Sequence, residues 1–323
     1  MAPLLEIKDL KVRFDTEMGL VDAVDGVSFE VNVGETLGLV GESGCGKSVT
    51  CHSILQLHPP NGRIVNGSIR FEKTELLSLD HARLDAIRGH DIAMIFQDPI
   101  GALNPVHTIG SQISESLKLH QGLANNRARS EAMRLLKVVG IPEAEQRLGE
   151  YPHQLSGGMN QRAMIAMAIS CRPKLLIADE PTTALDVTIQ AQILDLLQRL
   201  QREFDMSIIL ITHDLGVVAE MADRVVIIYS GRVVEEAGIK DIFRRPAHPY
   251  TAGLLNSLPR IDRDIDKLTL IEGSVPSPYS LPEGCHFAPR CDFARRRCTK
   301  ERPGLASLYP NHKAACFYPR NMT

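Results

Sequence analysis

The chain has 323 residues, which is enough for one large domain or two smaller ones. Its net charge of −3 gives no electrostatic reason to expect nucleic-acid binding, and the lack of tryptophan argues against a base-stacking platform. The apolar runs are too short to cross a bilayer, and the first ten residues lack the apolar core of a secretory signal. We therefore expect an intracellular protein without a disulfide framework.

Strand-like segments begin the chain and then alternate with helical stretches, which favours parallel βα units. Residues 4–14, 23–33 and 69–71 predict a flanking antiparallel sheet. The predicted strands of a buried parallel sheet are residues 36–40, 175–178 and 208–212. Each of these three ends at polar residues, and the carboxyl ends of parallel strands are where open α/β sheets bind ligands.

The later part of the chain has a different character. Residues from about 100 to 170 have helical spacing and predict a helical insert. Prolines recur after residue 240, and four of the seven cysteines lie beyond it. We therefore expect a domain at residues 1–240, with its helical subdomain at about 100–170, and a separate C-terminal extension at 241–323.

A phosphate-binding loop follows the strand at residues 36–40. The segment Gly41-Glu42-Ser43-Gly44-Cys45-Gly46-Lys47-Ser48 fits the pattern G-x-x-x-x-G-K-[ST], and a helix-compatible run from Ser48 through Val49 to Leu57 follows. Glycines allow backbone N–H groups to turn toward phosphate oxygens. Lys47 can reach the β- and γ-phosphates of ATP, and the Ser48 hydroxyl can bind Mg²⁺.

Two acids end the strand at residues 175–178. Adjacent carboxylates are costly at a strand end unless a cation is present. We expect Asp179 to bind Mg²⁺ and Glu180 to polarise the attacking water as a general base. His213 ends the next strand and would contact the γ-phosphate, while Gln97 follows the apolar run 92–96 and would reach Mg²⁺ or the water.

The segment from Leu155 to Arg162 (LSGGMNQR) resembles the signature of ABC ATPases. Ser156, Gly157 and Gly158 would form an anion-binding turn at a helix N-terminus. Met159 stands where the family commonly has Gln, and Gln161 follows two positions later, as in peptide-transporter relatives.

The resemblance to ABC ATPases covers residues 1 to about 240 and assigns further roles. Gln97-Asp98-Pro99 resembles the Q-loop, Ala184-Leu185-Asp186 the D-loop and His213 the switch histidine, while Phe14 is placed like the aromatic residue that stacks on adenine. A strand Phe is also often part of a core. The implied fold is α/β: a P-loop NTPase with a RecA-like parallel core, a flanking antiparallel subdomain and a helical signature subdomain.

The closer resemblance is to the ATPases of dipeptide and oligopeptide importers, most of all to the D-type subunit. It is carried by residues 97–105, 178–188 and 248–251, and by the cysteine-rich tail. It implies a head-to-tail dimer with a second ATPase, which in this family is a different chain. It also implies two membrane permease subunits and an extracytoplasmic binding protein. Some relatives import nickel or other ligands, so the family does not define the cargo. The protein would be peripheral, on the cytoplasmic side of the inner membrane.

Cys285, Cys291, Cys298 and Cys316 have neither zinc-finger nor ferredoxin spacing, but four thiols in a loop-rich tail suggest a soft-metal site. Charge does not choose between zinc and a [4Fe–4S] cluster, and the absence of any metal is the third alternative. The family resemblance favours the cluster. We expect a structural or redox role, and nucleotide binding that is independent of the tail.

The main alternative to an importer subunit is a soluble ABC ATPase of DNA repair or translation. Such proteins usually carry two cassettes or a long coiled coil. This chain has one cassette and no heptad run. A binding-only module with inactive chemistry is a third alternative, which the presence of Glu180 and His213 disfavours.

Overall fold

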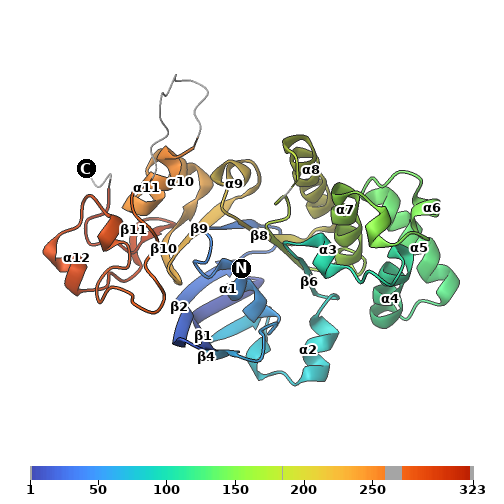
Figure 1. Ribbon diagram of the computed structural model, residues 1–323, viewed down its shortest axis with the longest axis horizontal. Helices are drawn as coiled ribbons and strands as arrows, with labels where there is room; N and C mark the ends of the chain where they lie inside the picture. Colours follow the sequence, from blue (N-terminus) through green and yellow to red (C-terminus); the bar gives the residue numbers. More distant parts are fainter. Residues whose placement is uncertain (1, 184, 259–270, 321–323) are drawn as a thin grey trace. The chain divides into compact units, whose positions relative to one another are not determined.

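The structure is a computed structural model that describes residues 2–183, 185–258 and 271–320. The chain forms two compact units. The first comprises Met1–Asn32, Thr36–Leu77 and Thr212–Thr323, and the second comprises Val33–Glu35 and Ser78–Ile211. Figure 1 shows the elements of both units coloured along the sequence.

An antiparallel sheet of the first unit has the strand order β2-β1-β4-β5. Its strands are β1 (Leu5–Thr16), β2 (Gly19–Val31), β4 (Gly62–Phe71) and β5 (Thr74–Glu75). Apolar side chains of β1 such as Leu5, Ile7 and Val12 are fully or almost fully buried, while Lys8 is exposed. This one-sided burial follows from the two-residue period of a strand with one face on the core.

A second sheet in the first unit holds the strand that precedes the phosphate-binding loop. Here β3 (Thr36–Val40) pairs in parallel with β9 (Arg224–Tyr229), and β9 forms a hairpin with β10 (Arg232–Gly238). The C-terminal strands β12 (His312–Ala314) and β11 (Ala306–Tyr309) extend the sheet beyond β10. The tail therefore shares a sheet with the ATPase core.

Helices complete the first unit. They are α1 (Lys47–Ile54), α9 (Leu215–Met221), α10 (Ile239–Arg244), α11 (Pro249–Asn256) and α12 (Arg296–Lys300), with 3₁₀ turns at Leu76–Ser78 and Ala288–Arg290.

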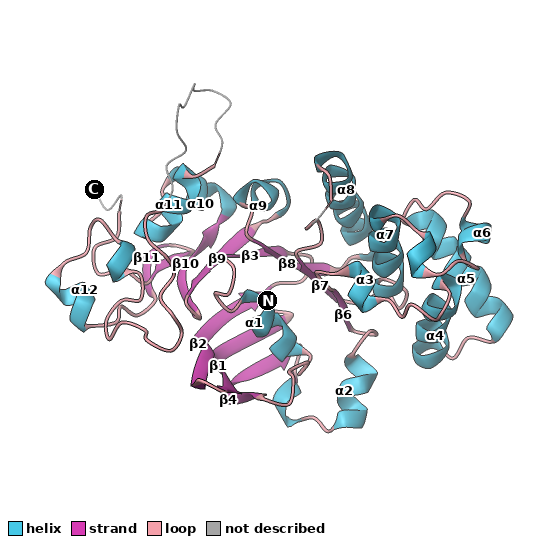
Figure 2. Ribbon diagram, in the orientation of Figure 1, coloured by secondary structure: helices cyan, strands magenta, loops and turns pink. Residues whose placement is uncertain are grey.

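The second unit combines three parallel strands with a group of helices, as Figure 2 shows. The strands β6 (Ile92–Ile95), β7 (Leu175–Asp179) and β8 (Ser207–Thr212) are adjacent in the order β8-β7-β6. The helices are α2 (His81–Ile87), α3 (Pro99–Ala102), α4 (Ile109–Gln121), α5 (Asn125–Val138), α6 (Ala144–Arg147), α7 (Gly157–Ala168) and α8 (Val187–Phe204), with a 3₁₀ turn at Pro152–Gln154. In the part of the chain that the structure describes, no helix is long and apolar enough to cross a membrane.

The predicted α/β fold is confirmed, and the three buried parallel strands lie within a residue or two of their predicted bounds. The expected helical insert contains helices α4, α5 and α7. The strands β9 to β12 were not predicted. The predicted domain boundaries stay predictions, and the two compact units divide the chain differently.

A buried hydrogen-bonded pair, Glu235 and His312, joins the C-terminal strand β12 to β10. The Glu235 carboxylate accepts hydrogen bonds from the backbone N–H groups of Ala247 and His248, at 2.7 and 2.8 Å. His312 Nε2 lies 2.7 Å from Glu235 Oε1, and both side chains are fully buried. Removing His312 would leave the buried charge of the Glu235 carboxylate without this partner.

We predict that His312→Leu lowers the free energy of unfolding by about 1–3 kcal/mol, because the buried Glu235 carboxylate loses a hydrogen-bond partner. Urea unfolding followed by circular dichroism measures it. The control is Arg83→Ala, because Arg83 and Asp80 form an exposed pair, with side chains 76% and 67% accessible. Exposed pairs contribute about 0–1 kcal/mol. Equal effects of the two substitutions would contradict the structural role of the buried pair.

Candidate active site

The phosphate-binding loop connects β3 to α1 and depends on glycine at three positions. A Cβ on Gly41 would lie 2.2 Å from the carbonyl oxygen of Ile228, and one on Gly46 would lie 2.5 Å from that of Ala23. Gly44 and Gly46 also have φ angles of 76° and 100°. At Gly41 and Gly46 there is no space for a side chain, and at Gly44 and Gly46 the backbone angles disfavour one. The glycines therefore allow the tight loop that the sequence pattern predicts.

Lys47, the first residue of α1, lies back over this loop. Its Nζ donates to the carbonyl oxygens of Gly41 and Glu42, at 2.8 and 3.1 Å, and the residue is only 5% exposed. The backbone carbonyls of the loop thus hold the buried ammonium group of Lys47 in place. Such a group suits a phosphate oxygen, because an anion compensates a cation that is largely removed from water.

Glu42, inside the loop, is bound by residues of the C-terminal region. Its backbone N–H donates to Tyr250 Oη at 3.0 Å. Its carboxylate receives two hydrogen bonds from Arg290, at 2.7 and 3.1 Å, and the Arg290 side chain is 5% exposed. The hydrogen bond to Glu42 raises the pKa of Arg290 above its ordinary value. The C-terminal region therefore contacts the nucleotide loop directly, and the expected independence of nucleotide binding from the tail stays a prediction.

Phe14, the predicted adenine-stacking residue, is half-buried in β1 and does not belong to the deep core. Its ring lies against Gly62, where a Cβ would stand 2.6 Å from Phe14 Cε1, and forms an edge contact with His58. Ser48 and Val49 are half-buried in the first turn of α1, while Ser43 is exposed in the loop. Cys45 is buried, and burial raises the pKa of its thiol.

The second unit brings Glu180 and Gln97 together. Asp179 ends β7 and is 3% exposed, and Glu180 follows with a φ of 45°, an uncommon angle for a residue with a side chain. Gln97 Nε2 donates to Glu180 Oε2 at 3.0 Å, and Thr183 Oγ1 donates to the same oxygen at 2.8 Å. The carboxylate of Glu180 is therefore held in one orientation. The sequence analysis did not predict the contact from Thr183.

The signature segment begins helix α7. Ser156 is its N-cap, and the Ser156 hydroxyl accepts a hydrogen bond from Met159 N–H at 3.3 Å. Gly157 and Gly158 form the first turn, and a Cβ on Gly157 would meet no atom within 4 Å. Gln161 is 2% exposed. Gln161, which the resemblance to ABC ATPases places among the nucleotide-binding residues, is buried in this chain, and its contact with nucleotide stays a prediction.

The remaining predicted residues lie at loop and helix starts. His213 is exposed after β8, next to Asp214, which caps α9 by accepting from Gly216 N–H at 2.7 Å. Asp186 caps α8 by accepting from Ile189 N–H at 2.9 Å. Ala184, the first residue of the predicted D-loop, lies outside the described residues. The phosphate-binding loop, Phe14 and His213 belong to the first unit, whereas Gln97, Asp179, Glu180, Asp186 and the signature belong to the second.

A second candidate site lies in the C-terminal region, where four cysteines far apart in sequence line one cavity of about 20 Å³. They are Cys285, Cys291, Cys298 and Cys316. Burial raises the pKa of three of these thiols, and that of Cys316 reaches about 11. Among the described residues, no set of three or more His, Cys, Asp or Glu side chains is arranged to hold a metal ion.

Backbone N–H groups face the sulfur atoms of this cavity. Cys298 Sγ accepts from Arg295 N–H at 3.5 Å. The other three sulfurs have backbone donors two residues further along the chain, at Phe287, Phe293 and Tyr318. Hydrogen bonds of this kind favour the thiolate form that binds metals.

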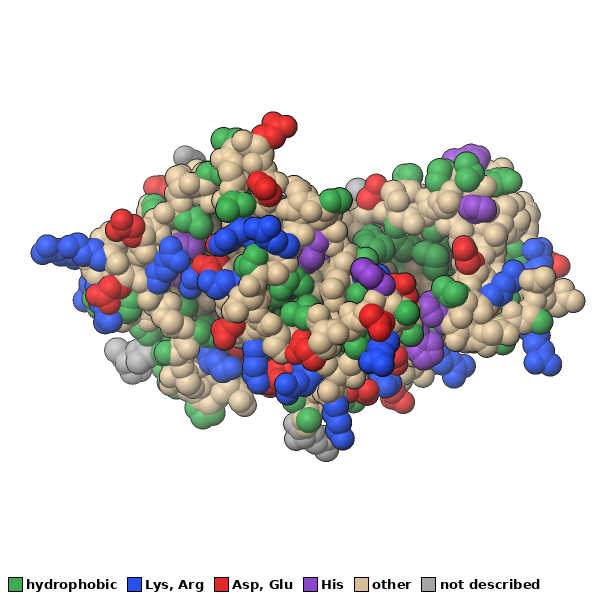
Figure 3. Space-filling view, turned by 90° about the horizontal axis from the view of Figure 1, so that it is seen from below, with side chains coloured by type: hydrophobic (Ala, Val, Ile, Leu, Met, Phe, Trp, Pro, Cys, Tyr) green, Lys and Arg blue, Asp and Glu red, His purple; other side chains and the backbone are tan. Residues whose placement is uncertain are grey.

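Arginines cover the aromatic walls of the same cavity. Arg297 stacks on Phe317 with 4.0 Å between its Cζ and the ring centre, and Arg295 stacks on Tyr318 at 4.2 Å. Basic side chains also lie at the left of Figure 3, the end at which Figure 1 places α12. Positive charge nearby would stabilise a group that carries four thiolates.

Comparison with protein families supports the reading of both regions. The family model described as ABC transporter matches residues 24–183. The model described as oligopeptide/dipeptide transporter, C-terminal region, matches residues 234–298.

Curated relatives match over almost the whole length. A putative peptide import ATP-binding protein of Brucella abortus is 54% identical, over 98% of this chain and 95% of the relative. The oligopeptide transport ATP-binding protein AppD of Bacillus subtilis is 53% identical over 98% and 97% of the two chains. The dipeptide transport ATP-binding protein DppD of Haemophilus influenzae is 51% identical over 98% and 96%.

Solved structures show the same fold for the ATPase part. The ATP-binding cassette MJ0796, a dimer with ADP and phosphate, has a TM-score of 0.66 at 26% identity and covers 73% of this chain and 98% of its own. The structure of cbiO1 from Clostridium perfringens has a TM-score of 0.63 at 26% identity, covering 75% and 91%. Together with the phosphate-binding loop and the capped signature helix, these similarities show that the chain belongs to the ABC transporter family of ATP-binding proteins.

Proposed function

We propose that the chain is the ATP-binding and ATP-hydrolysing subunit of a membrane importer for dipeptides, oligopeptides or a related small ligand. The observation that carries this proposal is the identity of 51–54% over 98% of the chain to relatives named for peptide import. The matched length includes the C-terminal region, which has its own family model. The cargo itself is not defined by this chain, because the family includes importers of different ligands.

Lys47 would bind the β- and γ-phosphates of ATP from its position over the loop carbonyls. Backbone N–H groups of the loop and the start of α1 would surround the phosphates. Ser48, Asp179 and Gln97 offer a hydroxyl, a carboxylate and an amide oxygen, which are the ligand types that Mg²⁺ prefers. When bound, Mg²⁺ would neutralise charge on the phosphate oxygens.

Glu180 would act as the general base that orients and polarises the attacking water. The two hydrogen bonds from Gln97 and Thr183 hold its carboxylate, so that part of the orientation exists before substrate binds. His213 would contact the γ-phosphate as a switch residue. These roles follow the family and the local contacts of each side chain.

A head-to-tail dimer would complete each nucleotide site with Ser156, Gly157 and Gly158 of the opposite subunit. The dimer of the MJ0796 cassette supports a dimeric arrangement, and cbiO1 is part of an ABC transporter complex. The partners would be a second ATPase chain and two membrane permeases, with a substrate-binding protein acting through them. The subunit would lie at the cytoplasmic side of the inner membrane. Relatives named for transport disfavour the soluble ABC alternative.

The cysteine cavity would hold a [4Fe–4S] cluster. Four thiols with backbone N–H donors and nearby arginines fit such a group in donor chemistry. A cubane cluster binds each thiolate through a different iron, so its ligands surround a volume, whereas zinc needs four sulfurs around one point. A cavity of about 20 Å³ holds little more than one water, so the side chains would move outward on loading. When bound, the cluster would supply a cross-link between tail segments.

Glu180→Gln is predicted to keep ATP binding and to lower the hydrolysis rate by about 10²–10⁴-fold, because it removes only the proton-accepting group. Phosphate release by the assembled transporter and nucleotide affinity measure the two properties. Glu145→Gln, an exposed substitution in α6, serves as the control. A variant that retains more than about a tenth of the rate would show that Glu180 is not the base.

Arg290→Ala should weaken ATP binding about tenfold and lower the free energy of unfolding by about 1–3 kcal/mol, because Glu42 loses a charge-assisted partner inside the phosphate loop. Nucleotide titration and urea unfolding provide the two values, with Lys300→Ala as an exposed control in the same region. A double-mutant cycle with Glu42→Gln isolates the pair. Additive effects in that cycle would disprove the coupling.

For the cluster, protein purified without air is predicted to be brown and to contain about four irons per chain. Replacing any one of the four cysteines by Ser should lower the iron content and make residues 285–316 more sensitive to protease, because the metal closes the site. Cys171→Ser is the matched control, since Cys171 lies in the second unit. Stoichiometric zinc would reject the cluster but keep the metal site, and the absence of both metals would reject the site.

A further inference from the structure

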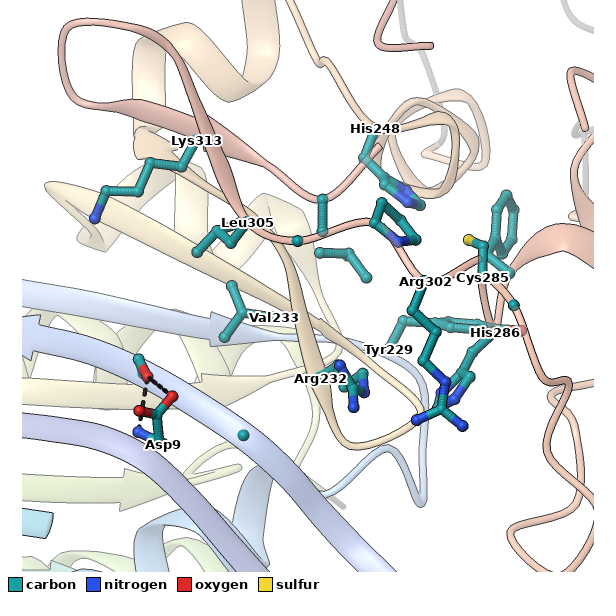
Figure 4. Close-up of a pocket in the computed structure, with 18 residues that line it drawn as sticks. Asp9, Tyr229, Arg232, Val233, His248, Cys285, His286, Arg302, Leu305 and Lys313 are labelled. Atoms are coloured by element: carbon teal, nitrogen blue, oxygen red, sulfur yellow. Dashed lines mark hydrogen bonds between the residues drawn. The ribbon is translucent and has the colours of Figure 1, made fainter. Parts of the chain in front are cut away.

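A cavity of about 440 Å³ lies beside the cysteine cavity and has no role in the function proposed above. Cys285, His248, Phe287 and Pro303 line both cavities, whereas no residue of the phosphate-binding loop 41–48 lines this one. Its volume is within the range of about 300–1,000 Å³ that is usual for sites of small organic ligands. Figure 4 shows the side chains around it.

Two arginines that line this cavity share a carboxylate with a lysine that lies outside the lining. Asp25 is only 8% exposed, and three cations contact its carboxylate oxygens. The distances are 2.7 Å from Lys11 Nζ, 2.9 Å from Arg232 Nε and 3.5 Å from a guanidinium nitrogen of Arg302. Arg232 and Arg302 both line the cavity. Three cations around a single carboxylate leave two positive charges in excess within this group, and an anionic ligand would compensate them.

His286 adds a polar atom without a partner at the same cavity. The residue is 6% exposed, and its Nε2 is buried without a hydrogen-bond partner. Its Nδ1 lies 3.3 Å from the carbonyl oxygen of Ser230, so Nδ1 carries the proton and donates it. In the neutral ring, Nε2 is then an acceptor. Less than 1 Å² of Nε2 is exposed, so a ligand with an O–H or N–H group would satisfy it after a small movement of the side chains around the ring.

The other part of the lining is apolar. Val233, Leu305, Phe287 and Ala315 contribute hydrocarbon surface. In Figure 4, Arg302, Arg232 and His286 lie to the right of Val233 and Leu305, while Asp9 and Lys313 lie to the left. The Asp9 carboxylate accepts a hydrogen bond from the neutral Ser28 hydroxyl at 3.5 Å and keeps its negative charge, while Lys313 pairs with Glu236 at 3.2 Å. The uncompensated positive charge is therefore at the Arg302 side.

We propose that this cavity is a second ligand site, for a small organic oxyanion with an apolar body and a hydrogen-bond donor next to its charged group. The carboxylate or phosphate would bind Arg302 and Arg232, the donor would bind His286 Nε2, and the body would fill the space against Val233 and Leu305. The site requires neither bound nucleotide nor a loaded metal, because none of these three contacts involves a residue assigned to either.

The test measures binding of model ligands to the full-length protein by calorimetry, with ADP present to occupy the phosphate-binding loop. N-acetyl-leucine carries the carboxylate, the N–H group and an apolar body. N-acetyl-leucinamide removes the charge, and 4-methylpentanoate keeps the carbon skeleton but lacks the acetamido donor. Inorganic phosphate and phenyl phosphate test the phosphate source of the oxyanion.

The site predicts that N-acetyl-leucine or phenyl phosphate binds at least about tenfold more tightly than the uncharged amide, because a charged partner strengthens each hydrogen bond. Arg302→Gln should weaken this binding about tenfold or more, Arg302→Lys should restore part of it, and Lys300→Gln should leave it unchanged. His286→Phe should abolish any preference for N-acetyl-leucine over 4-methylpentanoate. Tighter binding of phenyl phosphate than of N-acetyl-leucine would assign the oxyanion as phosphate.

The proposal is overturned if no anionic probe binds at millimolar concentration. It is also overturned if the amide binds as well as the acid, or if Arg302→Gln and Lys300→Gln have equal effects. Circular dichroism of each variant establishes that it is folded. The Arg302 side chain is 43% accessible, so we expect its replacement to be tolerated, and partial binding by Arg302→Lys shows that the charge carries the effect.

Discussion

The close packing of the phosphate-binding loop is the constraint on which the rest of the first unit depends. At Gly41 and at Gly46 the backbone passes so near to the carbonyls of Ile228 and Ala23, respectively, that no side chain fits. The loop is thereby fixed to β9 and β2, and Lys47 is folded over its carbonyls. Glu42 of the same loop contacts the C-terminal region. The C-terminal region is therefore in direct contact with the nucleotide-binding loop.

The C-terminal region is therefore more than an appendage to an ATPase. It adds two strands to the sheet of β10, buries the Glu235–His312 pair and binds Glu42 through Arg290 and Tyr250. Arg290 immediately precedes Cys291, one of the four cavity cysteines. A movement of Cys291 would therefore be passed to Glu42 through Arg290. In this way the proposed cluster is physically connected with the nucleotide-binding loop.

Much of the fold could be predicted from the sequence because local signals agreed with each other. The strand at 36–40, the glycines at 44 and 46 and the helix after Lys47 all indicate one structure. The strands β9 to β12 were not predicted. Strand β9 is a continuous apolar run that is not followed by catalytic or ligand-binding residue types, and the tail strands β11 and β12 are only four and three residues long. The contacts of Arg290 and Thr183 could not be predicted, because each depends on tertiary packing. The burial of Gln161 in α7 also depends on tertiary packing and was not predicted from the sequence.

We propose that ATP is held between the phosphate-binding loop of one subunit and the signature of another. Vanadate-trapped ADP followed by ultraviolet irradiation tests it, because bound vanadate cleaves the backbone next to the γ-phosphate position. If two subunits share the nucleotide in this way, the assembled transporter should be cleaved within residues 41–48 of one ATPase and at the signature of its partner. When the partner is a second copy of this chain, that signature is residues 156–158. Trapping with cleavage confined to other segments, or ATP hydrolysis by the transporter without any trapping, would contradict it.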